Sequence, residues 1–317
     1  MISTAMLQQP LFLVGSERSG TTLLRLMLSS HPQLAWNEEF EYVVDFMPAE
    51  HGWPLIDAYH RYLAHDFVFA SSKFTIDTAL SYPQLVNSFL LQRLALDRKP
   101  IAGATIHRYF SRLPRVWPEA KFVHLIRDGR DVARSIVEMG WAGNAWRASL
   151  YWEEAELEWD QLCRQVPESR RITIRFEDLV VNPARTLQPI CAFCGVSFDP
   201  AMLEYHRTTT YGPPDPSAVA AWKRKMPVED VRAVEAAIGP RLAERGYALS
   251  GYPVLALTAA RRRWLKARDF YGKLRFRIGR FGMNLVFQDF LARRINIRRW
   301  QERVQLRLND IERLHVK

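Results

Sequence analysis

Short apolar runs alternate with longer amphipathic stretches along the first two hundred residues. Four segments are predicted to be strands: Leu11–Val14, Ile101–Ile106, Lys121–Ile126 and Arg171–Phe176. Helices are predicted between and after these strands. One starts near Gly20, helices cover most of 52–99, and another passes through Ser135. A long helix runs from Trp146 to Gln165, and a further one begins at Pro183 with Asn182 as its cap. This alternation predicts an α/β fold, a three-layer sandwich with a central, mostly parallel sheet.

The first strand leads into a loop with the features of a phosphate-binding site. Gly15 and Gly20 have the glycine spacing of a Walker A loop, but Thr21 stands where that motif has lysine, and the cation is Arg18 inside the loop. Free N–H groups and the positive end of a helix dipole bind an anion at such a turn. We therefore expect a P-loop-like site for a phosphate-like group; a strand–turn–helix unit that binds nothing is the alternative.

A second anion site is predicted where the strand Lys121–Ile126 ends. Arg127 follows this strand directly, and Ser135 lies about two helical turns further, so both side chains can converge on one anion. The alternative is a solvated Arg-Asp-Gly-Arg-Asp turn with internal salt bridges. Two such junctions in one domain favour a ligand that carries phosphates at two separated positions.

The basic character of the chain is concentrated at its C-terminal end. The net charge is +10, yet residues 251–317 hold 17 Lys/Arg and 5 Asp/Glu (17 − 5 = +12), which leaves 27 and 29 (−2) for the other residues. A nearly neutral body argues against nucleic acid as a partner of the whole protein. The N-terminus lacks a basic stretch ahead of an apolar one, and no apolar run reaches membrane-spanning length, so we expect a cytoplasmic protein.

Three cysteines do not form a disulfide framework. Cys191 and Cys194 have C-x-x-C spacing near the end of a predicted helix, where two buried thiols are favoured over a metal or redox site. Zinc would need two further ligands, which the sequence does not place. No metal is expected.

Residues 251–317 are predicted to form a basic helical C-terminal extension of a domain at 1–250. Apolar residues recur in it at helical spacing beside arginines: Met283, Phe287, Phe290, Leu291 and Ile295, with Arg293, Arg294, Arg298 and Arg299. Such a helix can lie on an anionic membrane surface as a peripheral contact, or it can pack on the body of the protein or on a second subunit in a homodimer.

Three motifs together resemble those of the sulfotransferases that use 3′-phosphoadenosine 5′-phosphosulfate (PAPS). In order, they are Gly-Ser-Glu-Arg-Ser-Gly-Thr-Thr from Gly15, Arg-Asp-Gly-Arg-Asp-Val-Ala-Arg-Ser from Arg127, and Arg-Phe-Glu-Asp-Leu-Val-Val-Asn-Pro from Arg175. The resemblance covers roughly residues 9–249 and is close to the bacterial and protein-tyrosine branches. It implies that 1–250 is a sulfotransferase domain.

The resemblance also implies which residues bind the donor and its product, 3′,5′-adenosine bisphosphate (PAP). It assigns the 5′-phosphosulfate to Arg18, Ser19, Gly20, Thr21 and Thr22. It assigns the 3′-phosphate to Arg127 and Ser135. Trp222, with Lys223 and Arg224, looks like the family's element that caps the nucleotide.

The implied reaction is in-line transfer of a sulfuryl group to a hydroxyl acceptor with the help of a general base. Glu39 stands at the position of the catalytic glutamate of the protein-tyrosine branch, where partial burial would raise its pKa to suit proton transfer. His107 is the rival base, since the cytosolic branch uses a histidine at the end of its second strand. Arg18 suits stabilisation of the developing charge.

The acceptor is expected to be a hydroxyl-bearing small molecule, glycan or lipid. Residues 45–100 are predicted to form an acceptor lid, and their aromatic side chains suit a ring-bearing alcohol or an ordinary core equally well.

Two positions depart from the family pattern. Phe176 replaces a common tyrosine, and Gly103–His107 lacks the usual lysine, so Arg18 or a basic residue of 223–225 must supply that charge.

Two other functions compete with sulfuryl transfer. A P-loop-like kinase or NTPase is disfavoured by Thr21 and by Arg127 ahead of Asp128, where such enzymes have a Walker A lysine and an acid directly after the strand. A membrane-surface adaptor led by the basic tail leaves both anion sites unexplained.

Overall fold

The computed structural model describes residues 5–295 and 298–313. The chain forms two compact units. The first holds the residues up to Asp128 together with Trp152–Val219, and the second holds Gly129–Tyr151 with the residues from Ala220 onward. The predicted functional boundary at residue 250 stays a prediction.

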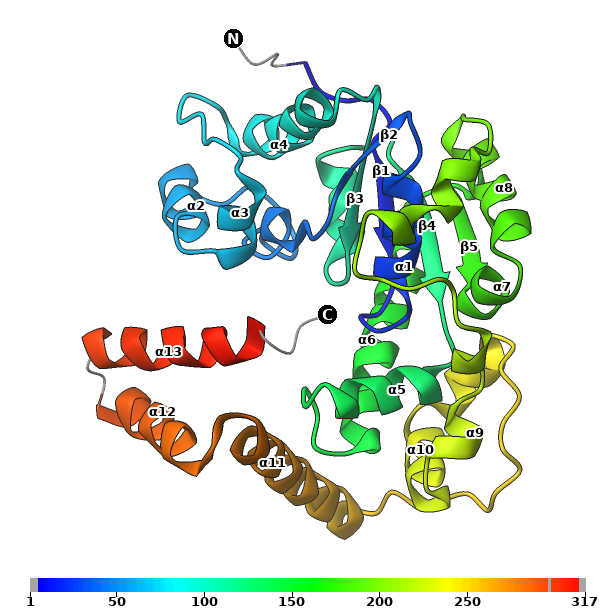
Figure 1. The fold of residues 1–317 in the computed structure, drawn as a ribbon, viewed down its shortest axis with the longest axis vertical. Coiled ribbons are helices and arrows are strands. Elements are labelled where there is room, and N and C mark those ends of the chain that lie inside the picture. Colours follow the sequence, from blue (N-terminus) through cyan, green and yellow to red (C-terminus); the bar gives the residue numbers. More distant parts are fainter. Residues whose placement is uncertain (1–4, 296–297, 314–317) are drawn as a thin grey trace. The chain divides into compact units, whose positions relative to one another are not determined.

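A parallel sheet organises the first unit (Figure 1). Within the described residues it has five strands in the order β2-β3-β1-β4-β5. Their bounds are Leu11–Val14 (β1), Leu34–Asn37 (β2), Ile101–Ile106 (β3), Lys121–Ile126 (β4) and Arg171–Arg175 (β5). The four predicted strands are confirmed, although Phe176 already belongs to the following helix. Strand β2 was not predicted, because four residues with no β-branched side chain give a weak strand signal.

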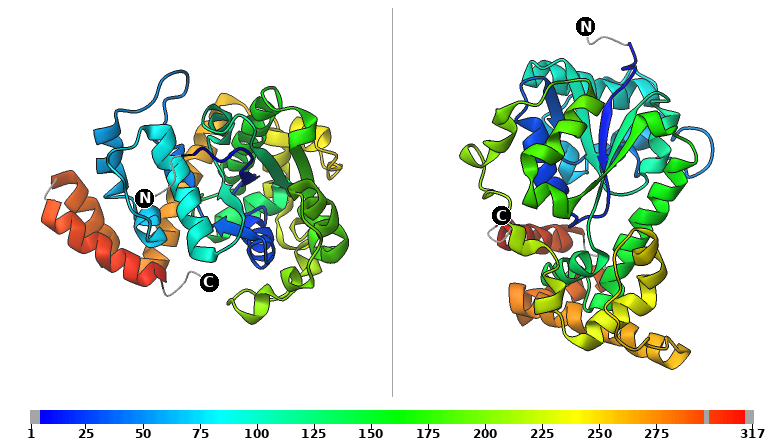
Figure 2. Two further views of the ribbon diagram at one scale, coloured as in Figure 1. Left: turned by 90° about the horizontal axis from the view of Figure 1, so that it is seen from above. Right: turned by 90° about the vertical axis from the view of Figure 1, so that its right-hand side faces the viewer.

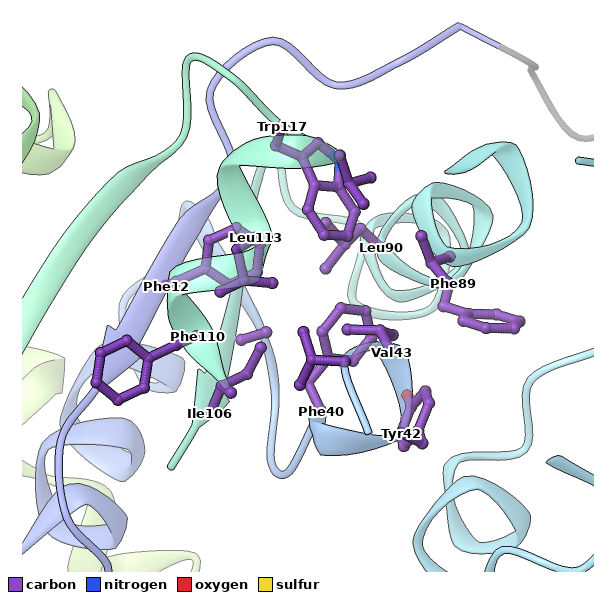
Figure 3. Packing of buried hydrophobic residues seen from close by; sticks show 14 of the residues in the cluster. Phe12, Phe40, Tyr42, Val43, Phe89, Leu90, Ile106, Phe110, Leu113 and Trp117 are labelled. Carbon is purple, nitrogen blue, oxygen red and sulfur yellow. The ribbon is translucent and has the colours of Figure 1, made fainter. Parts of the chain in front are cut away.

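Helices cover both faces of the sheet (Figure 2). Side chains of β1 alternate: Leu11 and Leu13 pack with α1 (Thr21–Ser29), α7 (Phe176–Val181) and α8 (Pro183–Cys194). Phe12 and Val14 pack on the other face with α4 (Tyr82–Asp97), the 3₁₀ helix η2 (Phe110–Arg115) and the C-terminal part of α6 (Ala145–Cys163). Figure 3 shows this second cluster around Phe12. The predicted three-layer sandwich is confirmed.

Most aromatic side chains of segment 45–100 belong to the core. Besides α4 the segment contains α2 (Ile56–Leu63) and α3 (Phe67–Ser72). Tyr59, Phe69 and Phe89 are buried in the same cluster as Phe12. Phe46, Trp53 and Phe67 stay exposed. The core accounts for much of this aromatic content, and the role of the segment as an acceptor lid stays a prediction.

Short 3₁₀ helices connect the larger elements of the first unit. They are η1 (Glu41–Val43), η3 (Glu168–Arg170), η4 (Pro200–Leu203), η5 (Tyr205–Arg207) and η6 (Pro216–Ala218). Helix α8 begins at Pro183 as predicted, and Asn182 is its N-cap residue, although the Asn182 side chain makes no capping hydrogen bond.

Buried charges connect the helices of the second unit. Its helices are α5 (Gly129–Glu138), the start of α6, α9 (Trp222–Lys225), α10 (Val228–Glu244), α11 (Ala259–Phe281), α12 (Met283–Ile295) and α13 (Arg298–Arg313). Arg130 of α5 is buried, pairs with Glu235 of α10 at 2.7 Å, and lies 3.8 Å from the ring centroid of Trp222. Asp131 Oδ1 accepts a hydrogen bond of 2.7 Å from the Trp222 backbone N–H. A solvated Arg-Asp-Gly-Arg-Asp turn is therefore wrong for Arg130 and Asp131, which hold α5, α9 and α10 together.

The C-terminal extension is helical over its described residues. Close backbone packing anchors α11, because a Cβ added at Gly272 would lie 2.2 Å from the Gly143 carbonyl oxygen. The Gly143 N–H donates to Asp269 Oδ1 at 2.7 Å, and Asn144 Nδ2 donates to the Leu265 carbonyl at 2.7 Å. Among the helices that the structure describes, none combines the length and apolarity needed to cross a bilayer.

Candidate active site

The candidate residues of the first unit follow the carboxyl ends of its strands. Gly15 follows β1, His107 follows β3, Arg127 follows β4 and Phe176 follows β5, while Glu39 lies two residues after β2. All strands are parallel, so these ends lie along one edge of the sheet, where ligands bind in α/β folds. The sheet thus collects residues that are far apart in sequence.

The loop after β1 has the geometry of an anion cradle. Gly20 is the N-cap residue of α1 with φ 96°, and no side chain caps the helix, so its first N–H groups have no capping acceptor. Arg18 has φ 67°, a left-handed conformation that is uncommon for residues with a Cβ atom. A Cβ added at Gly20 would lie 2.3 Å from the Phe176 ring, so this position requires glycine both for its φ and for space.

A cavity of about 270 Å³ opens beside this loop. Its wall includes Arg18, Arg127, Phe176, residues 20–23 and part of the segment 211–218. Ser19 is 1% exposed, and its hydroxyl has no hydrogen-bond partner among the described residues. A buried hydroxyl without a partner destabilises a protein unless a ligand supplies one. The loop therefore suits a phosphate or phosphosulfate group.

Arg127 is fixed from three sides at the wall of this cavity. Its Nη1 donates to the Arg18 carbonyl at 3.2 Å and its Nη2 donates to the Ala218 carbonyl at 3.0 Å. The guanidinium carbon lies 4.2 Å from the centroid of the Phe176 ring. The ring of Phe176 thus supports both Gly20 and Arg127.

The segment 211–218 is part of the cavity wall that the sequence did not reveal. Tyr205 Oη donates to the Gly212 carbonyl at 2.8 Å, and the Ala218 carbonyl accepts from Arg127 Nη2 at 3.0 Å, so both ends of the segment are held. The run Gly212-Pro213-Pro214 predicts a loop from its helix- and strand-breaking residues. Nothing in this local pattern indicates which ligand site the loop borders.

Glu39 and His107, the two candidate bases, differ in their surroundings. Glu39 is exposed, and nothing in the first unit buries it. His107 Nδ1 lies 3.1 Å from the Gly15 carbonyl oxygen, so the hydrogen of this contact is on Nδ1, and Nε2 of the neutral ring is an acceptor.

Glu41, which belongs to none of the sequence motifs, is a buried carboxyl group. Its Oε1 accepts a hydrogen bond of 2.9 Å from the His107 backbone N–H, and the residue is 7% exposed. Burial raises the pKa of Glu41 above its ordinary value of 4.5; the charge of His107 opposes this shift and that of Glu39 adds to it. Glu41 thus joins η1 to the end of β3.

Replacing Glu41 by Gln should change how stability depends on pH. Because its pKa is raised in the folded state, the wild-type Glu41 carboxyl binds its proton more tightly when the protein is folded than when it is unfolded. The wild-type protein therefore loses stability as the pH rises through this pKa. Gln cannot ionise. The melting temperature of Glu41→Gln relative to wild type should therefore increase from about pH 4 to about pH 7.

Thermal unfolding across this pH range measures the effect. Glu38→Gln serves as the control, because Glu38 is exposed and makes a surface ion pair of 3.1 Å with Arg25. A difference between Glu41→Gln and wild type that stays constant with pH would contradict this account of Glu41.

Four predicted binding residues belong to the second unit. Ser135 is 8% exposed on α5, and Trp222 is 5% exposed on α9. The side chains of Lys223 and Arg224 are exposed on the same short helix. The convergence of Ser135 with Arg127 on one phosphate, and the capping role of Trp222, Lys223 and Arg224, stay predictions.

The cysteines on α8 are buried, as expected. Cys191 Sγ lies 3.5 Å from Met202 Sδ. Burial raises the pKa of Cys191 to about 11 and that of Cys194 to about 12, which keeps both thiols protonated near neutral pH. In the described part of the chain, no three His, Cys, Asp or Glu residues are grouped so that they could hold a metal ion.

A family model described as "Sulfotransferase family" matches residues 10–200. The chain belongs to the sulfotransferase family. It is 26% identical over 270 residues to protein-tyrosine sulfotransferase 2 of Gallus gallus, a match that covers 75% of this chain and 69% of that protein. It is 25% identical over 269 residues to the human protein-tyrosine sulfotransferase 1, with 75% and 69% covered.

Solved sulfotransferase domains share the fold. The sulfotransferase domain from the curacin biosynthetic pathway matches with a TM-score of 0.57 and 20% identity, over 77% of this chain and 100% of that domain. The sulfotransferase domain of the Synechococcus PCC 7002 olefin synthase matches with a TM-score of 0.53 and 19% identity, over 74% and 97%.

The family resemblance inferred from the three motifs is thus confirmed. This sulfotransferase transfers a sulfuryl group from PAPS to a hydroxyl-bearing acceptor. The comparisons give no support to a P-loop kinase or NTPase, or to an adaptor function led by the tail.

Proposed function

We propose that Glu39 is the general base of this sulfotransferase and that Arg18 stabilises the charge that develops during transfer. The observation that carries the donor site is the cavity at the carboxyl edge of the sheet, bordered by the uncapped N-terminus of α1, Arg18 and Arg127. The choice of Glu39 rests on its motif position and on its place two residues after β2, at the same edge of the sheet. An anion bound there meets backbone N–H groups and guanidinium groups already in place, which is the arrangement that electrostatic catalysis requires.

The donor-binding residues are assigned by the motifs and supported by the geometry of the first unit. We assign the 5′-phosphosulfate to Arg18, Ser19, Gly20, Thr21 and Thr22, since Ser19 has a buried hydroxyl without a partner and α1 has uncapped N–H groups. We assign the 3′-phosphate to Arg127 with Ser135. Trp222, Lys223 and Arg224 are proposed to cap the nucleotide.

The proposed chemistry needs one proton transfer and one centre of positive charge. When bound, PAPS supplies the sulfuryl group, whose bond to the bridging phosphate oxygen breaks as the bond to the acceptor oxygen forms. A Glu39 carboxylate oxygen takes the acceptor's hydroxyl proton, and the Arg18 guanidinium stabilises negative charge on the transferring group. Because Glu39 is exposed, the bound substrates must provide whatever burial its carboxylate needs to become a stronger base.

His107 is the second candidate for the base, and one observation favours it. The contact between Nδ1 and the Gly15 carbonyl leaves Nε2 of the neutral ring able to accept a proton next to the phosphate loop. The turnover of Glu39→Gln compared with that of His107→Gln separates the two candidates.

We propose a small molecule, a glycan or a lipid as the carrier of the acceptor hydroxyl. The curated relatives named above are protein-tyrosine sulfotransferases, so a tyrosine phenol is a further acceptor to assay. The homodimer, the cytoplasmic location and the peripheral membrane contact are also proposals; the last is developed below.

Nucleotide-dependent thermal unfolding tests the proposed site. PAP should raise the melting temperature, because a ligand that binds only the folded protein stabilises it by about 2.7 kcal/mol at a hundred times its Kd. ADP, and ATP with magnesium, should raise it much less at equal concentration. A larger shift with magnesium-ATP than with PAP would contradict the proposed donor site, and transfer of labelled sulfate from PAPS to a tyrosine peptide would identify a phenolic acceptor.

A further inference from the structure

Helix α12 points its large apolar side chains away from its packed face. Val286, Asp289 and Ala292 recur every third residue and are buried. The opposite side carries Met283 and Phe287, which are 72% and 57% exposed, and Phe290, which is 56% exposed. A helix of a globular protein normally has the reverse pattern, with its largest apolar residues inward.

The packed face of α12 carries an ion-pair cluster beside the buried Val286 and Ala292. The Asp289 carboxylate forms an ion pair of 2.7 Å with Arg277 of α11 and another of 2.9 Å with Arg293. These pairs lower the pKa of Asp289 and keep its carboxylate ionised. The Arg277–Asp289 pair thus joins the packed face of α12 to α11, while the other side of α12 exposes large apolar side chains.

Helix α11 combines exposed aromatic rings with a high density of positive charge. Residues 259–281 contain nine Lys/Arg and one Asp. Trp264 and Tyr271 are 49% and 67% exposed, and their spacing of seven residues puts them on one side of the helix. Arg268 lies between them, with its guanidinium carbon 4.8 Å from the Trp264 ring centroid.

We propose that these two exposed faces bind the surface of an anionic lipid bilayer. We call them the tail surface, which consists of Trp264, Arg268, Tyr271 and Arg275 of α11, and of Met283, Phe287, Phe290 and Arg294 of α12. Lys and Arg attract anionic headgroups, while Trp, Tyr, Phe and Met enter the boundary between headgroups and acyl chains. Both kinds of residue are present and exposed on each helix.

The charge of the tail favours a lipid surface over a second copy of this chain. Two copies would each bring 17 Lys/Arg and only 5 Asp/Glu in residues 251–317, so like charges would face one another. An anionic bilayer offers both the opposite charge and an apolar phase. Nucleic acid offers the charge but no apolar phase for Met283 and Phe287. The side chains of Arg298 and Arg299, also expected beside this stripe, lie outside the described residues.

Vesicle co-sedimentation of the full chain tests this proposal. We expect binding to vesicles of phosphatidylcholine with phosphatidylglycerol, weaker binding as salt is raised, and little binding to phosphatidylcholine alone. The double substitution Phe287→Ser with Phe290→Ser should weaken binding more than about tenfold, because binding scales with buried apolar area. The matched control is Tyr252→Ser with Val254→Ser, which removes two exposed apolar side chains outside these helices, 43% and 90% exposed, at unchanged charge.

Three results would overturn the proposal. The first is equal binding to neutral and anionic vesicles. The second is no vesicle binding together with tight binding of an oligonucleotide. The third is a stable dimer, seen by light scattering, that the Phe287→Ser and Phe290→Ser pair dissociates. Cooperative thermal unfolding of each variant without nucleotide verifies that it is folded, and since the tail surface plays no part in the proposed catalytic roles, failure of one proposal leaves the other intact.

Discussion

Replacing Glu39 by Gln is expected to lower kcat by about 10²–10⁴-fold, the usual contribution of a general base. Gln keeps the size of the side chain but cannot take the acceptor's proton. Binding of PAP should change little, because Glu39 is exposed and is assigned no contact with the nucleotide. Steady-state kinetics with PAPS, together with PAP binding by calorimetry, separate the two effects.

Two further variants make this prediction specific. Glu38→Gln removes an exposed carboxylate one residue away and should leave kcat nearly unchanged. His107→Gln tests the rival base, whose Nε2 is positioned to accept a proton by the contact of Nδ1 with the Gly15 carbonyl. If His107→Gln abolishes turnover while Glu39→Gln keeps it, the base is His107 and our assignment is wrong.

Replacing Arg127 by Ala is expected to weaken PAP binding by about 30–4000-fold. The estimate follows from the loss of about 2–5 kcal/mol when one partner of a buried, hydrogen-bonded charge pair is truncated. Arg127 is 7% exposed and held by the Arg18 and Ala218 carbonyls, so its guanidinium is already ordered before a phosphate binds. Arg127→Lys should recover only part of the affinity, since lysine keeps the charge but loses the planar fork of donors.

Calorimetry with PAP measures this loss, and two controls accompany it. Arg207→Ala removes an arginine that is 67% exposed and pairs with Glu204 on the surface, so it should leave PAP binding unchanged. Thermal unfolding without ligand shows whether Arg127→Ala remains folded. Equal losses of PAP affinity in Arg127→Ala and Glu39→Gln would contradict the separate roles proposed for these residues.

The local pattern of the chain was enough to predict most elements of the fold. Strands β1, β3 and β4 are mainly apolar runs, and β5 alternates polar and β-branched apolar residues ahead of a helix start; both patterns are recognisable without tertiary information. Strand β2 gives no such signal, since Leu34–Asn37 becomes a strand by pairing with β3 at the edge of the sheet. Its absence from the prediction concealed that Glu39 also follows the carboxyl end of a strand.

The residues of the candidate site likewise fall into two groups: those that local motifs predict, and those whose roles depend on tertiary contacts. Arg18 and Arg127 were found because each lies in a motif whose spacing expresses a local requirement: a tight turn, a helix N-terminus, or a cation directly after a buried strand. Glu41 and segment 211–218 were missed, because their roles depend on contacts with residues more than sixty positions away in the chain. The ring of Phe176 contacts both Gly20 and Arg127, which no local pattern indicates.

The sequence by itself determined the alternation of strands and helices, the phosphate loop, and the concentration of charge in the tail, because these follow from side-chain periodicity and turn chemistry over a few residues. The tertiary structure decided which residues share a surface. The strand order β2-β3-β1-β4-β5 gathers candidate residues at one edge, and the burial of Val286, Asp289 and Ala292 leaves the large apolar side chains of α12 exposed. Both results arise from burial and pairing across long sequence separations, which local preferences do not encode.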